Sequence, residues 1–223
     1  MTAQARLLTR FGDHFYAFFK PAGWLTHGAG TDAPDLVTWI LAQSGLPRNL
    51  RPVHRLDVDT SGVVLCATHR GRAEACGWFA DRKAHKTYLA LVAGRARSKG
   101  VIRHALREGK GTIPAETRYI TAERLGGFTL VEVSPITGRK HQIRRHLASV
   151  GLPVVGDTRH RGSFRPVPAF PGRLWLHATV LRVPFGEGDR EIRSPVPPEL
   201  EATLVALRAA LNTSTDTAGG GEE

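Results

Sequence analysis

The stretch that decides the organisation of this chain is His54-Arg55-Leu56-Asp57-Val58-Asp59-Thr60-Ser61-Gly62, followed by the apolar run Val63-Val64-Leu65-Cys66-Ala67. The apolar run predicts a buried strand. Asp57 lies between an arginine and a Thr-Ser-Gly turn at the start of that strand, where burying a carboxylate costs free energy unless it is paired. We therefore expect Asp57 to have a cationic partner.

Composition limits the class of protein. The chain has 223 residues, 41% of them hydrophobic, which is enough for one domain with its own core. It carries 31 Lys and Arg residues against 20 Asp and Glu, a formal net charge of +11. That excess favours a polyanionic partner, with nucleic acid as the first expectation, over an acidic small substrate.

The cysteines and the N-terminus indicate the compartment. Cys66 and Cys76 form no Cys-x-x-Cys pair, and we interpret them as buried thiols in a reducing environment. Residues 1–6 precede no apolar core of a signal peptide, and no apolar run approaches membrane-spanning length. We expect a cytoplasmic protein that contacts no membrane and acts as a monomer.

Hydrophobic periodicity predicts short strands interspersed with helices. Gly12-Asp13 and Gly126-Gly127 separate strand-like runs and predict two β-hairpins. The expected strands are residues 6–11, 14–19, 63–68, 86–94, 116–124, 128–134 and 174–181. The expected helices are residues 35–43, capped by Asp32 or Asp35, 70–82, 139–150 and 199–211. The C-terminal helix has an apolar stripe of Leu200, Leu204, Leu207 and Leu211.

Three segments are expected to lack regular structure. Residues 103–111 are basic and predict a surface loop, and residues 162–172 are rich in Gly, Pro and Arg. From Asn212 onward the Ser, Thr, Gly and Glu content predicts a disordered tail. The sequence thus indicates an α+β fold: one domain over 1–211, with a mixed, largely antiparallel sheet flanked by helices, and a tail over 212–223.

The helix expected at 139–150 places Ile143, Leu147 and Val150 on one face, which predicts that this face packs on the core. Arg144 lies beside that stripe rather than opposite it. Its side chain could therefore point inward at the margin of the core.

Four stretches in order along the chain resemble the RluA-type RNA pseudouridine synthases. They are Lys20-Pro21-Ala22-Gly23, the central His-Arg-Leu-Asp motif with its Thr-Ser-Gly, Lys86-x-Tyr88, and Gly138-Arg139-Lys140-His141-Gln142-Ile143-Arg144 with the blocks at 151–157 and 173–178. Together they span about residues 7–185. The last block is most similar to the TruC branch, which acts on transfer RNA.

The resemblance implies roles for individual residues. It makes Asp57 the catalytic aspartate, Tyr88 the ring stacked on the uracil, and Arg144 the ion-pair partner that holds Asp57 ionised. An arginine fork suits this last role because it gives a carboxylate two parallel hydrogen bonds and lowers its pKa. The expected substrate-binding residues are Arg55, Arg139, Lys140, His54, Thr60 and Leu176.

The implied reaction is isomerisation of uridine to pseudouridine in a structured transfer or ribosomal RNA. The target base must be flipped out of its stack, and stacking on Tyr88 together with phosphate contacts offsets that cost. Asp57 attacks the sugar carbon or removes the neighbouring ribose proton, and the sequence leaves both open. Tyr88 could accept the proton lost from carbon 5 of uracil. No cofactor is needed, because no hydride moves and no group leaves.

Other interpretations carry less weight. His141, His146 and His177 suggest a metal, but no His-Glu-x-x-His motif or cysteine cluster supports zinc, and we expect no metal site. Asp59 is interpreted as a surface carboxylate without a role. A non-catalytic RNA-binding or folding factor on the same scaffold is the alternative function. A glycoside hydrolase would need paired carboxylates, which only Asp57 and Asp59 could supply.

Overall fold

The central motif leads into strand β4 (Ser61–Ala67), whose seven residues are all buried, as the apolar run predicts. In the computed structural model, which describes residues 4–28, 33–160 and 166–216, β4 lies between two other strands. It pairs antiparallel with β2 (Phe15–Lys20) and parallel with β11 (Leu176–Phe185). The first and last thirds of the chain therefore meet at the motif that contains Asp57.

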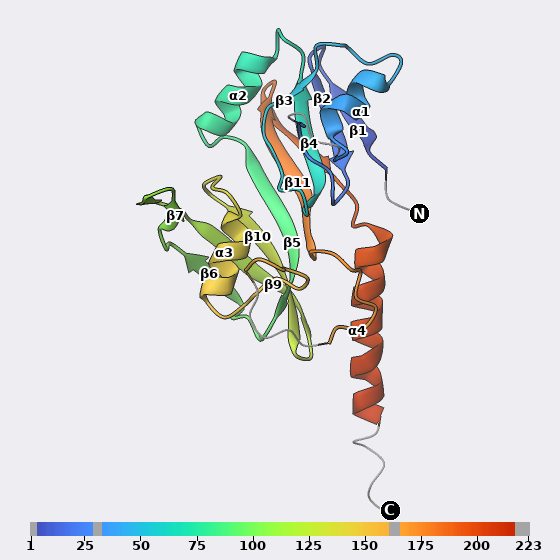
Figure 1. Ribbon diagram of the computed structural model, residues 1–223, viewed down its shortest axis with the longest axis vertical. Helices are drawn as coiled ribbons and strands as arrows, with labels where there is room; N and C mark the ends of the chain where they lie inside the picture. Colours follow the sequence, from blue (N-terminus) through green and yellow to red (C-terminus); the bar gives the residue numbers. More distant parts are fainter. Residues whose placement is uncertain (1–3, 29–32, 161–165, 217–223) are drawn as a thin grey trace, which may run out of the picture.

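Ten of the twelve described strands form one sheet in the order β1-β2-β4-β11-β5-β10-β9-β6, with β3 paired to β4 and β12 to β11 (Figure 1). Among the described pairs only β4 with β11 is parallel, so the predicted mixed, largely antiparallel sheet is confirmed. Its other strands are β1 (Arg6–Phe11), β3 (Arg51–Pro52), β5 (His85–Ala93), β6 (Lys99–Ile102), β9 (Thr117–Leu125), β10 (Phe128–Pro135) and β12 (Gly188–Arg193).

Four helices flank the sheet in the described part of the chain: α1 (Leu36–Ala42), α2 (Arg72–Ala80), α3 (Gln142–Ser149) and α4 (Pro198–Asp216). The carboxylate of Asp35 accepts a hydrogen bond from the Thr38 amide at 2.9 Å, so Asp35 caps α1. Leu200, Leu204 and Leu207 of α4 are buried, as their spacing predicts. None of these helices has both the length and the apolarity to cross a membrane.

The two faces of β5 pack against different helices, because successive side chains of a strand point to opposite sides. Tyr88 and Ala90 belong to the same buried cluster as Ile143 and Leu147, two side chains of α3. Leu91 belongs instead to a second cluster built around leucines of α4. Tyr88 therefore shares a face of the sheet with α3, which lies against β9 and β10 in Figure 1.

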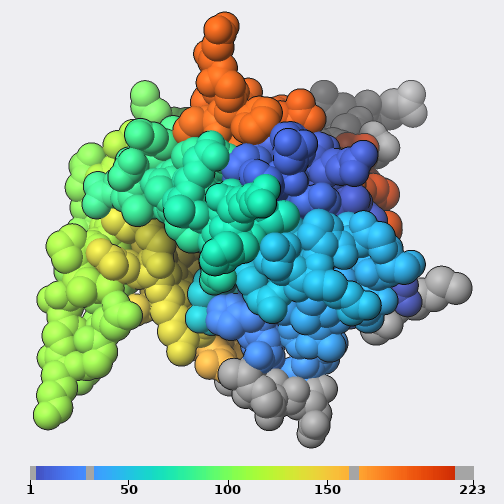
Figure 2. Space-filling view, turned by 90° about the horizontal axis from the view of Figure 1, so that it is seen from above, coloured from blue at the N-terminus to red at the C-terminus, as the bar shows by residue number. Residues whose placement is uncertain are grey.

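The segment expected to be a surface loop, 103–111, contains structure that the sequence did not predict. It holds most of a two-stranded hairpin, β7 (Leu106–Glu108) and β8 (Gly111–Ile113), which turns at Gly109 with φ +57°. The hairpin extends from the body of the molecule as the lime arm in Figure 2. Its strands are three residues long and mostly polar, so they lack the apolar alternation by which a strand is recognised.

Helix α3 is shorter than the predicted 139–150. It begins at Gln142 because His141 adopts a left-handed conformation, φ +52°, and the Gln142 side chain accepts hydrogen bonds from the Arg139 amide and the Thr137 hydroxyl. It ends at Ser149. Val150 is therefore 42% exposed, and its predicted place in the core is wrong.

The C-terminal helix is longer than predicted. Helix α4 continues to Asp216, so the disorder expected from Asn212 onward is wrong over 212–216, and residues 217–223 lie outside the described chain. The Thr213 hydroxyl donates to the carbonyls of Ala209 and Ala210, which lets a weak helix former remain in a helix. Extending an existing helix also costs less than starting one.

The cysteines follow the prediction only in part. Cys66 is buried in β4, and burial raises the pKa of its thiol. Cys76 is exposed on α2, so its predicted burial is wrong. The buried face of that helix is formed by Ala75 and Trp78, and Cys76 lies outside it.

Gly62, the glycine of the central motif, should not tolerate a side chain. Its φ is +130°, and a Cβ at this position would lie 2.3 Å from the Ala178 carbonyl oxygen of β11. Gly62→Ala should therefore lower the free energy of unfolding in urea by about 3 kcal/mol or more. Gly45→Ala is the matched control, because Gly45 has φ +85° but nothing within 4 Å of the added Cβ. Equal losses in both variants would contradict the close approach of β4 and β11.

Candidate active site

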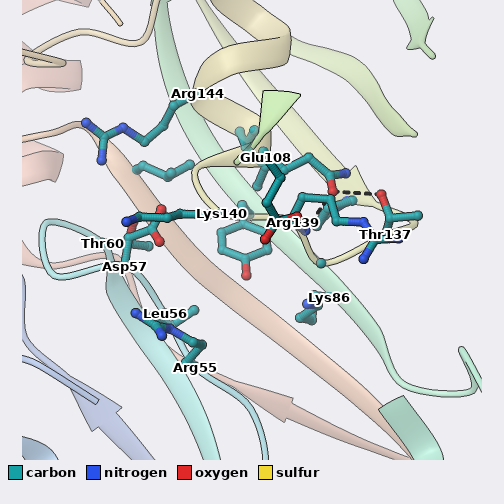
Figure 3. Close-up of a pocket in the computed structure, with 16 residues that line it drawn as sticks. Arg55, Leu56, Asp57, Thr60, Lys86, Glu108, Thr137, Arg139, Lys140 and Arg144 are labelled. Atoms are coloured by element: carbon teal, nitrogen blue, oxygen red, sulfur yellow. Dashed lines mark hydrogen bonds between the residues drawn. The ribbon is translucent and has the colours of Figure 1, made fainter. Parts of the chain in front are cut away.

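An open cavity of about 360 Å³ lies on the α3 side of the sheet, at the end of the central motif (Figure 3). Its lining comes from residues of the segments 55–60, 86–88 and 135–144, together with Glu108 of β7 and Leu176 of β11. Segments far apart in sequence thus contribute to one concave surface, the usual form of a small-molecule or nucleotide site.

Asp57 is half-buried and opens a tight turn in which the Thr60 amide donates to the Asp57 carbonyl at 3.1 Å. Among the described residues no cation lies within 4.0 Å of its carboxylate, so the expected direct ion pair is absent. The charge of Asp57 instead acts through space on Lys20 and Arg144, whose pKa values it raises. The prediction was wrong because Asp57 faces an open cavity, where water solvates its charge.

Lys20 is a fully buried cation that the sequence did not single out. Its ammonium donates to the carbonyls of Pro21, Trp24 and Val58 at 2.8, 2.7 and 3.2 Å. Burial lowers the pKa of Lys20 to about 7, although the carboxylates of Asp57 and Asp59 raise it. Lys20 thereby fastens the Lys-Pro-x-Gly turn to the residue that follows Asp57.

Arg144 lines the cavity, but its guanidinium fork binds a different carboxylate from the predicted one. Its Nε and Nη2 each donate to Asp157 at 2.7 Å, and both side chains are almost completely buried. Nη1 lies 3.6 Å from Asp59, to which we had assigned no role. Burial disfavours the charged form, yet the hydrogen bonds to Asp157 outweigh it and raise the pKa of Arg144. The predicted Arg144 fork on Asp57 is therefore wrong.

Tyr88 and Thr60 line the same cavity as Asp57. Burial and the charge of Asp57 raise the pKa of the Tyr88 phenol, so the hydroxyl is protonated near neutral pH. The Thr60 side chain is 2% exposed, and its hydroxyl has no hydrogen-bond partner within the described residues. Buried hydroxyls are normally paired, so Thr60 is an exception in the wall of the cavity.

The other predicted substrate-binding residues divide into two groups. Arg55, Arg139, Lys140 and Leu176 line the cavity. His54 does not: its Nε2 accepts from the Leu65 amide, and its ring stacks on Phe79 at 4.7 Å. Burial lowers the pKa of His54 to about 3, which keeps the ring neutral. The structure therefore gives His54 a supporting place behind the cavity rather than a place in its wall.

Sequence reasoning gave no role to several residues that line the cavity, among them Lys86, Glu108 and Gln142. Lys86 could have been found, because it lies two residues before Tyr88 on the same strand and must point to the same face. Glu108 could not, since its hairpin was not predicted. The Gln142 side chain is occupied by the hydrogen bonds from Thr137 and Arg139 described above.

The three histidines considered for a metal lie apart. His146 contacts the Thr117 hydroxyl at 2.8 Å and the His104 carbonyl at 2.9 Å, and His177 contacts Ser61 at 2.8 Å. His141 Nδ1 lies 3.0 Å from His160 Nε2. In the part of the chain described by the structure, no three His, Cys, Asp or Glu side chains gather as a metal site would require.

Comparison with known proteins places the chain in a family. Residues 14–149 match the RNA pseudouridylate synthase family. The chain is 33% identical to the ribosomal large subunit pseudouridine synthase C of Vibrio parahaemolyticus, covering 89% of this chain and 68% of that protein. It is also 33% identical to the tRNA pseudouridine synthase C of Pectobacterium carotovorum, covering 77% of this chain and 53% of that protein.

A solved structure agrees in fold. The human RNA pseudouridylate synthase domain containing 1 superposes with a TM-score of 0.73 at 27% identity, covering 92% of this chain and 95% of the human one. The motif around Asp57, the position of Tyr88 on the same cavity and these matches indicate the same family. The chain belongs to the RNA pseudouridylate synthase family, the RluA-type isomerases that act on RNA.

Proposed function

We propose that this protein isomerises a uridine of a structured transfer or ribosomal RNA to pseudouridine, with Asp57 as the catalytic residue. The observation that carries the proposal is that Asp57 and Tyr88, from distant segments, line one open cavity of about 360 Å³. A reactive carboxylate and an aromatic ring that share a cavity suit a single extruded nucleotide.

The charge around the cavity supports an RNA substrate. Arg55, Arg139 and Lys140 are exposed and line the cavity, where their charges favour phosphates. The relatives reported above are named for large-subunit ribosomal RNA and for transfer RNA. Either class supplies folded RNA in which the target base must leave its stack before it can react.

In the proposed reaction the flipped uracil stacks on Tyr88 and its ribose faces Asp57. Either the Asp57 carboxylate bonds to C1′ as the C1′–N1 bond breaks, or it removes the proton on C2′. Both routes leave the bonding electron pair on the uracil. The base then turns so that carbon 5 meets C1′, and a carbon–carbon bond forms as the Asp57–C1′ bond breaks or, in the second route, as Asp57 returns its proton to C2′. Carbon 5 then loses its proton and N1 gains one. Substrate and product have the same atoms, so the reaction is an isomerisation.

The direct test is to incubate the purified protein with transfer RNA and with ribosomal RNA fragments and to map pseudouridine in each. We expect conversion of a defined uridine without added metal or nucleotide. Mapping cellular RNA with and without the gene would identify the natural target. RNA binding without any conversion would support the non-catalytic RNA-binding factor instead.

Tyr88 should act mainly through its ring. Tyr88→Ala removes the stacking surface and should lower kcat/KM by about 5- to 150-fold, because stacking a base on an aromatic ring contributes about 1–3 kcal/mol. Tyr88→Phe keeps the ring and should retain RNA affinity. A loss in Tyr88→Phe equal to that in Tyr88→Ala would contradict the stacking role and show that the phenol hydroxyl is needed.

A further inference from the structure

Lys86 lines the cavity, and the proposed reaction assigns no role to its charged side chain. It lies on β5 two residues before Tyr88, so both side chains point to the same face of the sheet. Within the described residues no carboxylate lies within ion-pair distance of its ammonium. Lys86 is half-buried in the cavity wall, and this partial burial lowers the pKa of its ammonium.

Lys86 lies at a different end of the cavity from Asp57, as Figure 3 shows. Its Nζ is 6.0 Å from the centroid of the Phe79 ring and 4.0 Å from where a Cβ of Gly138 would lie. The charge of Asp57 acts on Tyr88, whereas that of Lys86 acts on His54. A molecule that reacts at Asp57 and lies over Tyr88 therefore extends toward Lys86.

The other cations that line the cavity are either paired with a carboxylate or exposed to solvent. The guanidinium of Arg144 is bound by Asp157. Arg55, Arg139 and Lys140 are exposed, and water already solvates their charges. Lys86 alone among the described cations of the lining combines partial burial with the absence of a carboxylate or hydrogen-bond partner. An anion that enters the cavity therefore meets an ammonium with no carboxylate partner among the described residues.

The reaction itself produces an anion at that end. When the C1′–N1 bond breaks, the bonding pair stays on N1 and delocalises onto the two carbonyl oxygens of uracil. This holds whether Asp57 bonds to C1′ or takes the C2′ proton. We propose that Lys86 is a catalytic residue that binds a carbonyl oxygen of the detached uracil and stabilises its negative charge. The proposal rests on the proposed function.

The test compares Lys86→Met with the matched control Lys83→Met, in which an exposed lysine paired with Asp81 loses the same charge. We expect Lys86→Met to lower the single-turnover rate at saturating RNA by about 10²-fold, as removal of one preorganised donor does elsewhere. RNA affinity should match that of Lys83→Met. Lys86→Arg, which keeps the charge, should recover part of the rate.

RNA containing 5-fluorouridine at the target provides a second readout. Fluorine withdraws electrons and stabilises the uracil anion without help from Lys86. Relative to the wild type, Lys86→Met should therefore slow cleavage of the 5-fluorouridine glycosidic bond less than it slows cleavage of the uridine bond. Because both rates come from the same variant, a partly unfolded fraction cancels in their ratio. Equal impairment with the two substrates would overturn the proposal.

Two further outcomes separate the possible failures. If Lys86 instead binds a backbone phosphate, Lys86→Met weakens RNA binding and reduces the slope of log affinity against log salt by about 0.7–0.9. The rate at saturating RNA is then unchanged, and the inference is wrong. If the wild-type protein converts no uridine, the proposed function fails. A wild-type rate in Lys86→Met overturns only the role of Lys86.

Discussion

Asp57→Asn should lower the single-turnover rate of pseudouridine formation by at least about 10³-fold, while RNA affinity stays close to that of the wild type. The amide has nearly the same shape as the carboxylate, but it neither bonds to C1′ nor accepts the C2′ proton. The turn that presents residue 57 depends on the backbone bond from the Thr60 amide, which the substitution leaves in place. The rate is measured with excess enzyme and the affinity by filter binding.

Asp59→Asn is the control for Asp57→Asn. It removes the same charge two residues further on, and the Asp59 side chain is 47% exposed and 3.6 Å from Arg144. We expect it to retain most of the wild-type rate. If Asp57→Asn kept full activity, or if both variants lost activity equally, the assignment of Asp57 as the catalytic residue would be wrong.

Asp157→Asn should strongly destabilise the fold. The side chains of Arg144 and Asp157 are 1% and 0% exposed, so the substitution leaves the buried guanidinium with only the half-exposed carboxylate of Asp59, 3.6 Å from Nη1. Removing one partner of a buried ion pair costs about 3–5 kcal/mol. Urea denaturation followed by circular dichroism measures the difference, with Glu191→Gln, which breaks exposed ion pairs, as the control. A loss below that of the control would contradict the importance of the pair.

The same pair predicts how stability depends on pH. Burial raises the pKa of Asp157, but the hydrogen bonds from Arg144 and from the amides of His160 and Arg159 lower it from 3.8 to about 2. Because the pKa is lower in the folded state, the contribution is fully present above the unfolded value and is lost as pH falls from about 4 to about 2. Asp157→Asn should therefore weaken the fall in unfolding free energy across this interval, whereas an unchanged slope would contradict the assignment.

The parts of the fold that the sequence predicts are those that neighbouring residues determine. The run 63–67 is apolar throughout and forms the buried strand β4, Asp35 caps α1, and the leucine spacing of α4 gives its buried stripe. Such features follow from strand and helix periods, which act over a few residues. The resemblance added Asp57 and Tyr88, which the folded chain brings to one cavity.

Interactions between distant segments could not be predicted from strand and helix periods. Arg144 was identified as an inward-pointing cation, but three carboxylates, Asp57, Asp59 and Asp157, compete for it, and only the packed backbone gives Asp157 both hydrogen bonds. The hairpin β7–β8 was missed because its short polar strands stabilise each other by backbone pairing rather than by an apolar face.

By itself, then, the sequence determined the secondary structure of the apolar segments, the class of the sheet and the two side chains around which a uridine site is proposed. The tertiary structure decided which strands became neighbours, which carboxylate Arg144 binds, how deeply Lys20 is buried and where Lys86 points. The physical reason is that periodicity reports the side on which a residue is buried, whereas the partner of a charge depends on chain segments that only folding brings together.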